Sequence, residues 1–213
     1  MSDVDSSITH MVKWYSDKRP LYEKLSKRIK KKLDELFIEK KISYLAIQER
    51  TKSISSFREK LVRKKYSKAD ECKDLSGIRI IVSMLFEIDS VVKVLIETFK
   101  IVDGIKDKAL DLKPNEFGYR SIHVVATLTQ EEAQKYKRFS GMFFEIQVRT
   151  IVQHLWAEFE HRYRYKSPVT LPPDLQHQIS KLAAKAEDVD EHFQRVMAQL
   201  DEHARIELKR HKG

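Results

Sequence analysis

The sequence predicts an α+β fold in which a mixed β-sheet is flanked by helices and extended by helical segments at both ends. Short runs rich in Ile and Val, which are typical of strands, alternate with segments whose apolar residues recur three and four positions apart, as on one face of a helix. The length of 213 residues suits one domain with an adequate core. We therefore expect N-terminal helices over 1–40, a core over 41–167 and a C-terminal helical extension over 168–213.

The N-terminal part of the chain is predicted to be mainly helical. Residues 18–40 have the spacing of a long amphipathic helix that tolerates Pro20 near its start, and a shorter helix is expected before it. Residues 42–47 contain too few polar alternations for a surface loop and predict a strand. Residues 53–66 then return to helical spacing.

The middle of the chain continues the alternation of strand and helix. Residues 78–84 and 101–105 predict strands, and residues 88–99 predict a helix between them. In that helix we expect four side chains to face the core: Val91, Val92, Leu95 and Ile96. The helix over 53–66 has a narrower apolar face, formed by Phe57 and Leu61.

The C-terminal half is predicted to complete the sheet and to end in a long charged helix. The expected elements are a loop over 107–117, strands over 121–128 and 142–149 with a polar helix between them, and helices over 151–165 and 174–209. The last helix carries an apolar stripe of Leu182, Val189, Phe193, Val196 and Leu200. This stripe packs either on the domain or on another subunit.

Composition limits the possible partners and compartments. The formal charge of +9 and the pI near 9.4 predict attraction to polyanions, which leaves nucleotides, RNA and anionic membranes open. A single cysteine, Cys72, excludes an internal disulfide and a zinc knuckle. No run is apolar enough to cross a bilayer, and residues 1–10 are too polar for a secretory signal, so we expect a cytoplasmic protein.

Basic residues cluster in two places. The first cluster, within 24–32, is interleaved with apolar residues at helical spacing and is typical of a solvated helix face. The second precedes an acidic, glycine-containing segment and is a candidate phosphate site: Arg50, Lys52, Arg58, Lys60, Arg63, Lys64 and Lys65. Because the chain has no glycine-rich P-loop, ATP would be held by arginines and lysines.

Two carboxylates lie near predicted strands. Asp74, in KDLSGIRI, comes a few positions before a buried strand and is expected beside Arg79, where it acts in catalysis or as a cap. In FFEIQVRT, strand alternation puts Glu145, Gln147 and Arg149 on one face. If both carboxylates lie at strand ends of one sheet, they can hold Mg²⁺ against a triphosphate, because this ion prefers one or two carboxylates with phosphate oxygens.

The run GYRSIH offers an aromatic ring, a cation and an imidazole at the start of a strand. Tyr119 is suited to stack on a base. The alternative is that Tyr119 and His123 only pack at a strand edge.

Four segments in the same order resemble the synthetase domain of the RelA/SpoT family: RTKSISSFREKLVRK, KDLSGIRI, FGYRSIH and FEIQVRT followed by HLWAEFEHRYRYK. The resemblance covers residues 40–166 and implies a nucleotidyltransferase-like synthetase core over 41–167. With no hydrolase domain before the motifs and no long tail after them, we expect a small alarmone synthetase.

The resemblance also implies roles for individual residues. It gives magnesium binding to Asp74 and Glu145, with Glu145 also the general base for the acceptor hydroxyl. It assigns ATP to Arg50, Lys52, Lys60, Arg63 and Arg79. The acceptor nucleotide is assigned to Tyr119, which stacks on guanine, with His123, Gln147 and His154, and its phosphates to Lys113 and Asn115.

The activity implied is transfer of pyrophosphate from ATP to the ribose 3′-hydroxyl of GDP or GTP, which makes (p)ppGpp. The chain departs from the family pattern in KPNEFGYRSIH, where Glu116 and Phe117 stand between the asparagine and the glycine. Some toxic members encoded beside antitoxins modify the 3′ end of tRNA instead, and others use adenine nucleotides to make ppApp. The basic charge and altered loop fit such an RNA acceptor.

Two further readings remain open. A non-catalytic RNA-binding protein with this fold would lack a carboxylate, and the presence of both Asp74 and Glu145 disfavours it.

Small members of the family commonly form tetramers through terminal helices, so the resemblance implies a homo-oligomer. A C-terminal helix folded onto its own domain explains the apolar stripe equally well.

Overall fold

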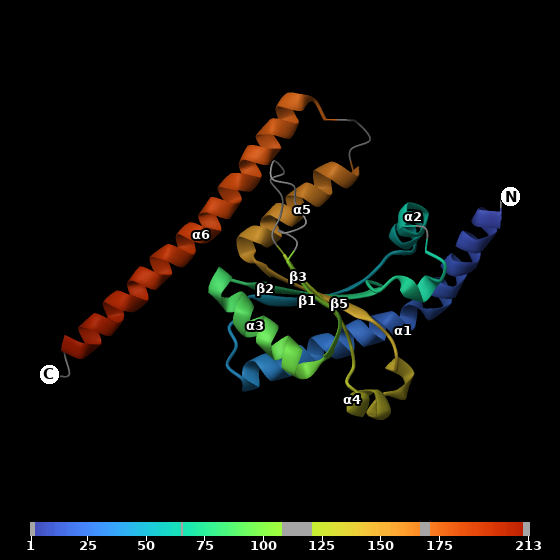
Figure 1. Ribbon diagram of the computed structural model, residues 1–213, viewed down its shortest axis with the longest axis horizontal. Coiled ribbons are helices and arrows are strands. Elements are labelled where there is room, and N and C mark those ends of the chain that lie inside the picture. The colour runs from blue at the N-terminus through green and yellow to red at the C-terminus, as the bar shows by residue number, and fades with distance from the viewer. Residues whose placement is uncertain (1–2, 65, 108–120, 167–170, 211–213) are drawn as a thin grey trace.

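The computed structural model describes residues 3–64, 66–107, 121–166 and 171–210 (Figure 1). Its long helices are α1 (Asp3–Glu39), α2 (Ile54–Lys64), α3 (Leu85–Thr98), α5 (Ile151–Lys166) and α6 (Pro173–Arg210). The strands are β1 (Ala46–Thr51), β2 (Ser76–Val82), β3 (Lys100–Asp107), β4 (Ile122–Thr127) and β5 (Phe144–Thr150). Short helices are α4 (Gln130–Lys135), η1 (Ala69–Glu71) and η3 (Lys137–Phe139).

The strands form one mixed sheet in the order β1-β2-β5-β4-β3. β2 and β5 are parallel, and the other neighbouring pairs are antiparallel. Helices α1 and α3 cover one face of this sheet, while α5 and α6 lie on the opposite side (Figure 1). The predicted α+β class with a mixed sheet is therefore confirmed.

The main core lies between the sheet and helices α1 and α3. Strand alternation directs Phe144, Ile146 and Val148 of β5 into it, and all three are fully buried. α1 contributes a row of buried residues at helical spacing: Leu25, Ile29, Leu33 and Phe37. The open face of the sheet, opposite this core, is left for polar side chains.

A second, smaller core attaches α2 to the N-terminal half of α1. The rings of Tyr15 and Phe57 lie 4.7 Å apart between centroids, and Leu61 and Leu75 are buried with them. The expected apolar face of Phe57 and Leu61 is confirmed. This core fixes α2 beside the end of β1, where the second basic cluster of the sequence is found.

Three details of the predicted elements are wrong. The expected break between two N-terminal helices does not exist, because Pro20 lies inside a continuous α1 whose buried residues, including Tyr15 and Leu25, hold the helix on both sides. Residues 42–45 are not a strand, since Lys41 at φ 54° and an Ile42 N–H donated to the Phe37 carbonyl (2.8 Å) form a helix C-terminal turn.

The third wrong detail concerns α3. Ile96 is 50% exposed rather than inward, and Val92 is only partly buried. The inward positions of Val91 and Leu95 are confirmed, and the buried face is completed by Ile88 and Val94 rather than by Val92 and Ile96.

Helix α6 contacts the domain through a narrow set of residues. Among its described residues Ala183 and Asp190 are buried, and Asp190 accepts a hydrogen bond from the Thr150 hydroxyl at the end of β5. The apolar stripe predicted for this helix is not covered by the domain, because its five members are 41–55% exposed. In the described part of the chain, no helix is long and apolar enough to cross a membrane.

We predict that Ile29→Ala lowers the free energy of unfolding by about 2–4 kcal/mol, because it leaves a cavity in the main core. Ile38→Ala is the matched control, since Ile38 lies on the same helix and is 73% exposed. That change should cost less than about 0.5 kcal/mol. Urea unfolding followed by circular dichroism measures both, and equal losses would contradict the burial described here.

Candidate active site

The open face of the sheet carries a polar cleft of about 270 Å³. Ten residues line it: Gln48, Glu49, Arg50, Lys52, Asp74, Gly77, Ile78, Arg79, Glu145 and Gln147. Six of them are residues that the sequence singled out for ATP, metal or acceptor. The cleft therefore gathers candidates from three separate segments of the chain.

Strand register brings these candidates together. Gly77 of β2 is paired with Arg50 of β1 on one side and with Glu145 of β5 on the other. Two residues further along β2, Arg79 is paired in the same way with Gln48 and Gln147. Because alternate residues of a strand share a face, both rows point into the cleft. The lack of a side chain at Gly77 leaves the space between Arg50 and Glu145 open.

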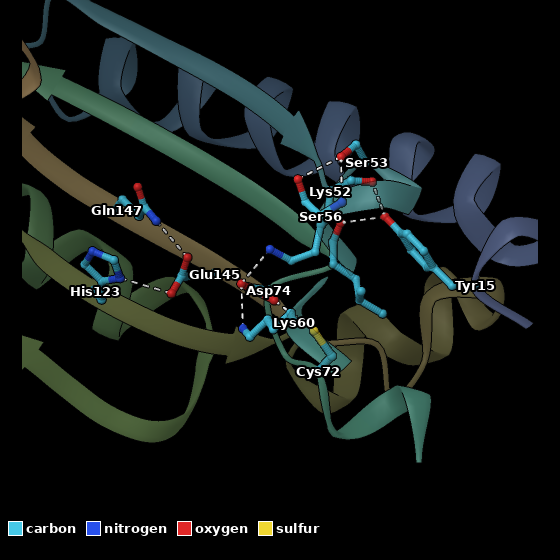
Figure 2. Close-up of polar contacts among 11 residues, drawn as sticks. Tyr15, Lys52, Ser53, Ser56, Lys60, Cys72, Asp74, His123, Glu145 and Gln147 are labelled. Atoms are coloured by element: carbon cyan, nitrogen blue, oxygen red, sulfur yellow. Dashed lines mark hydrogen bonds and ion pairs between the residues drawn. The ribbon is translucent and has the colours of Figure 1, made fainter. Parts of the chain in front are cut away.

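Asp74 lies just before β2 and is surrounded by donors (Figure 2). Its Oδ2 is 3.0 Å from Lys52 Nζ and 2.7 Å from Lys60 Nζ, and Cys72 Sγ donates to its Oδ1 at 3.0 Å. Burial raises the pKa of Asp74, but the charge of Lys52 and the contacts with Cys72 and Lys60 outweigh it and lower the pKa to about 2. Asp74 is therefore ionised throughout the neutral range.

The expectation that Asp74 lies beside Arg79 is corrected in one respect. Both residues line the cleft, but the ion-pair partners of Asp74 are the lysines, while Arg79 Nη1 pairs with Glu158 of α5 at 2.8 Å. The reason is position: Asp74 lies before the start of β2, next to the end of β1, whereas Arg79 lies further along the strand under α5.

Glu145 is held by two side chains of the same sheet face (Figure 2). Its Oε1 is 3.0 Å from His123 Nδ1, and its Oε2 accepts a hydrogen bond of 2.8 Å from Gln147 Nε2. Burial and the nearby charge of Asp74 raise the pKa of Glu145, but the contacts with His123 and Gln147 lower it further, so that the net pKa lies below the usual value. Glu145 is a fixed, ionised carboxylate.

Arg149 orients Gln147, one of the two side chains that hold Glu145. It is 8% exposed, and its Nη2 donates to Gln147 Oε1 at 2.7 Å while its Nε donates to Ser121 Oγ at 3.2 Å. Because the Gln147 oxygen is used by Arg149, its amide nitrogen is turned toward Glu145. The sequence pattern placed Arg149 on the correct face and suggested that its guanidinium joins Glu145 and Gln147 in metal, base or phosphate binding, whereas the structure shows it supporting Gln147.

His154 lies on α5, on the Arg79 side of the site. Its pKa is lowered by burial and by the charges of Arg79 and Arg149, despite the opposing charge of Glu158. Among the described residues, neither His154 Nδ1 nor Arg79 Nε has a hydrogen-bond partner, although both atoms are buried. These two nitrogens are therefore available to hydrogen-bond a ligand or a water molecule at this side of the site.

Other predicted site residues lie elsewhere. Arg63 is on an exposed part of α2 and does not line the cleft, although Lys60 of the same helix reaches Asp74. Lys113, Asn115 and Tyr119 fall outside the described residues, together with the Glu116–Phe117 departure from the family pattern.

The sequence patterns did not predict that Tyr15 supports the site. Tyr15 of α1 is fully buried, and its hydroxyl donates to the Lys52 carbonyl at 2.6 Å, with Arg19 Nε donating to the same oxygen at 3.2 Å. These bonds hold the end of β1, so that the Lys52 side chain is directed at Asp74 (Figure 2). Helical spacing in the sequence gives no sign of such a contact, because it joins residues 37 positions apart.

The two carboxylates fit the ligand chemistry of a divalent cation. Asp74 and Glu145 stand at the starts of the parallel strands β2 and β5 and line the same cleft. Within the described residues no cluster of three or more His, Cys, Asp or Glu side chains forms a complete metal cage. Two carboxylates that leave the remaining coordination positions to phosphate and water match the preference of Mg²⁺.

We predict that the stability difference between the wild-type protein and Asp74→Asn shrinks on acidification. A carboxyl with a lowered pKa in the folded state stabilises the fold above its unfolded pKa and loses this contribution as pH falls through the folded pKa. For a pKa that falls from 3.8 to about 2, the difference should decrease by about 1 kcal/mol between pH 7 and pH 3. Urea unfolding at each pH measures it, and a constant difference would contradict the ion pairs of Asp74.

Comparison with known proteins places this cleft in a family. Residues 49–170 match the family model described as a region found in RelA / SpoT proteins. The chain is 32% identical over 159 residues to the GTP pyrophosphokinase YwaC of Bacillus subtilis, covering 71% of this chain and 73% of that protein. It is 27% identical over 168 residues to the GTP pyrophosphokinase YjbM of the same organism, covering 77% of each.

A solved structure agrees with the sequence matches. The small alarmone synthetase 1 of Bacillus subtilis, bound to its product pppGpp, superposes with a TM-score of 0.74 at 25% identity and covers 88% of this chain and 97% of its own. The family match includes Asp74, Arg79, Glu145 and Gln147 of the cleft. The fold, the motifs and these similarities together show that the chain belongs to the RelA/SpoT family.

Proposed function

We propose that this protein is an ATP-dependent pyrophosphokinase that transfers pyrophosphate to the ribose 3′-hydroxyl of GDP or GTP to make (p)ppGpp. One observation carries the proposal: two ionised carboxylates, Asp74 just before β2 and Glu145 on the neighbouring parallel strand β5, share a cleft with Arg50, Lys52 and Arg79. The names of the two Bacillus subtilis relatives, both GTP pyrophosphokinases, support the same reaction.

The donor binds on the side of the cleft formed by β1 and β2. Arg50, Lys52 and Lys60 supply positive charge for the triphosphate, and Arg79 presents a guanidinium held by Glu158. These side chains neutralise the charge that the phosphates carry as the pyrophosphoryl group moves. Asp74 and Glu145 would hold Mg²⁺, which would supply further charge neutralisation for the phosphates.

Glu145 activates the acceptor. Its carboxylate takes the proton of the 3′-hydroxyl, the ribose oxygen forms a bond to the β-phosphorus of ATP, and the bond between that phosphorus and the α–β bridging oxygen breaks to release AMP. A lowered pKa keeps Glu145 in the ionised form that a general base requires. The contacts with His123 and Gln147 fix its direction.

A guanine nucleotide is favoured over tRNA by the state of the N-terminal basic cluster. Lys30 pairs with Asp34 at 2.7 Å, Lys31 with Glu35 at 3.8 Å and Lys32 with Glu132 at 2.6 Å. Lys30 and Lys32 thus already have close acidic partners, which lowers their value as phosphate contacts along an RNA backbone. Modification of the tRNA 3′ end, and synthesis of ppApp, remain alternative outcomes of the same chemistry.

We predict that purified protein with Mg²⁺ and γ-labelled ATP transfers label to GDP or GTP when GDP, GTP, ATP and bulk tRNA are offered separately. Glu145→Gln should lower this rate by about a hundredfold or more, because the amide cannot accept the proton. Thin-layer separation of the nucleotides and gel separation of the tRNA identify the labelled product.

Glu35→Gln is the control for this assay, since Glu35 lies on α1 away from the cleft and its side chain is 63% exposed. It should leave the rate unchanged. Label on tRNA alone would replace the guanine acceptor with an RNA, and normal turnover by a folded Glu145→Gln protein would remove the base role.

We also propose that the protein forms a homo-oligomer through α6. The apolar stripe of Leu182, Val189, Phe193, Val196 and Leu200 is half exposed along one helix, and the same helix uses other residues, Ala183 and Asp190, to contact its own domain. An exposed stripe of this kind is typical of a surface that another subunit covers.

We predict that light scattering gives a mass above one chain for the wild-type protein and that Phe193→Glu lowers it, because a charge then interrupts the stripe. Glu202→Lys is a charge-changing control at an exposed position of the same helix and should keep the wild-type mass. A wild-type mass equal to one chain would rule out the assembly.

A further inference from the structure

Lys52 and Lys60 both form ion pairs with the carboxylate of Asp74, one of the two proposed metal ligands. They come from different elements, the end of β1 and the middle of α2, yet both ammonium groups lie within 3.0 Å of the same oxygen, Asp74 Oδ2. The other oxygen, Oδ1, accepts the Cys72 thiol hydrogen. Both oxygens of Asp74 are therefore engaged before any substrate is bound (Figure 2).

The contacts are well shielded from water. The side chains of Lys52, Lys60 and Asp74 are only 13%, 19% and 21% exposed. Charges in such surroundings interact more strongly than on the surface, because solvent screens them less. An exposed ion pair would yield easily to a cation from solution, whereas this group resists it.

The charges around Asp74 also disfavour binding of a free divalent cation. Lys52 and Lys60 place two positive charges beside the single negative charge of Asp74, and Arg50 and Arg79 line the same cleft. A free cation that enters must therefore either displace the lysines, leaving two largely buried ammonium groups without their carboxylate, or add its charge beside the positive charges that are already there. Both routes are costly.

Binding of a triphosphate would give Lys52 and Lys60 an alternative to Asp74. Its oxygens offer new anionic partners to Lys52 and Lys60, which can turn from Asp74 while staying paired. The freed carboxylate oxygen then faces the phosphates, and together they form the oxygen environment that Mg²⁺ prefers. The same two lysines thus exchange one anion for another as the donor binds.

Resting on the proposed function, we propose that Lys52 and Lys60 are a built-in counter-ion for Asp74 that keeps the free protein from binding divalent cations and makes metal entry depend on the donor triphosphate. The effect is reciprocal: if binding of the triphosphate raises the affinity of the site for the cation, binding of the cation must raise the affinity for the triphosphate by the same factor. Asp74 restrains the lysines just as the lysines restrain Asp74.

Manganese binding to the nucleotide-free protein tests the proposal, with Mn²⁺ measured by electron paramagnetic resonance. The wild-type protein should bind Mn²⁺ weakly, and Lys60→Met and Lys52→Met should each tighten it by about tenfold or more, because a neighbouring positive charge has been removed. Adding Asp74→Asn to Lys60→Met should abolish the gain. Lys64→Met is the matched control on the exposed part of α2 and should bind Mn²⁺ as the wild-type protein does.

The reciprocal arm uses ATP in the presence of EDTA and isothermal titration calorimetry. Asp74→Asn should bind metal-free ATP more tightly than the wild-type protein, because the lysines are no longer held by a carboxylate. A residue that served only as a metal ligand would leave this affinity unchanged. Thermal unfolding of each variant establishes that it is folded.

The outcomes separate this proposal from the proposed function. Equal Mn²⁺ affinity in the folded wild-type, Lys52→Met and Lys60→Met proteins overturns the counter-ion role, while pyrophosphate transfer by the wild-type protein stands. Unchanged ATP affinity in Asp74→Asn overturns it as well. If the wild-type protein also fails to transfer pyrophosphate with Mg²⁺ present, the proposed function falls on that separate measurement.

Discussion

The parallel pairing of β2 with β5 is the constraint on which the site depends. It sets Gly77 against Glu145, and it places the segment that carries Asp74 at the start of a neighbouring strand. Parallel neighbours require a long connection, and here the chain between them contains α3, β3, β4, α4 and η3. Residues 71 positions apart in the sequence, Asp74 and Glu145, thereby come to line one cleft.

The rest of the site is built outward from that pair. β1 adds Arg50 and Lys52 from the antiparallel side, and the small core of Tyr15, Phe57 and Leu61 holds β1 and α2 in place. On the other side, β4 adds His123 opposite Gln147. Asp74, Glu145 and Gln147 each have their direction set by side-chain partners, so that this part of the cleft is ordered before a ligand binds.

Much of this could be predicted from the sequence where a short-range pattern carries the information. The alternation in FFEIQVRT identified the face shared by Glu145, Gln147 and Arg149, and helical spacing identified Phe57 and Leu61 as buried. Helix ends were less predictable, because the turn at Lys41 depends on a backbone conformation that side-chain hydrophobicity does not report.

Contacts between distant segments could not be predicted. Nothing in the neighbourhood of Asp74 indicates that Lys52 and Lys60, rather than Arg79, are its partners, since that choice follows from strand register and from the docking of α2. The same holds for Tyr15 and the Lys52 carbonyl. Motif order located the site, whereas tertiary packing decided which charges meet.

The hydrogen bond between Thr150 and Asp190 gives α6 a mechanical connection to the cleft. Thr150 ends the strand that carries Glu145, and Asp190 lies near the middle of a helix of 38 residues, about 57 Å long at 1.5 Å per residue. Because the same strand carries Glu145 near its start, this bond ties the middle of α6 to the strand of the proposed general base. A molecule that shifted α6 would therefore act on the end of that strand.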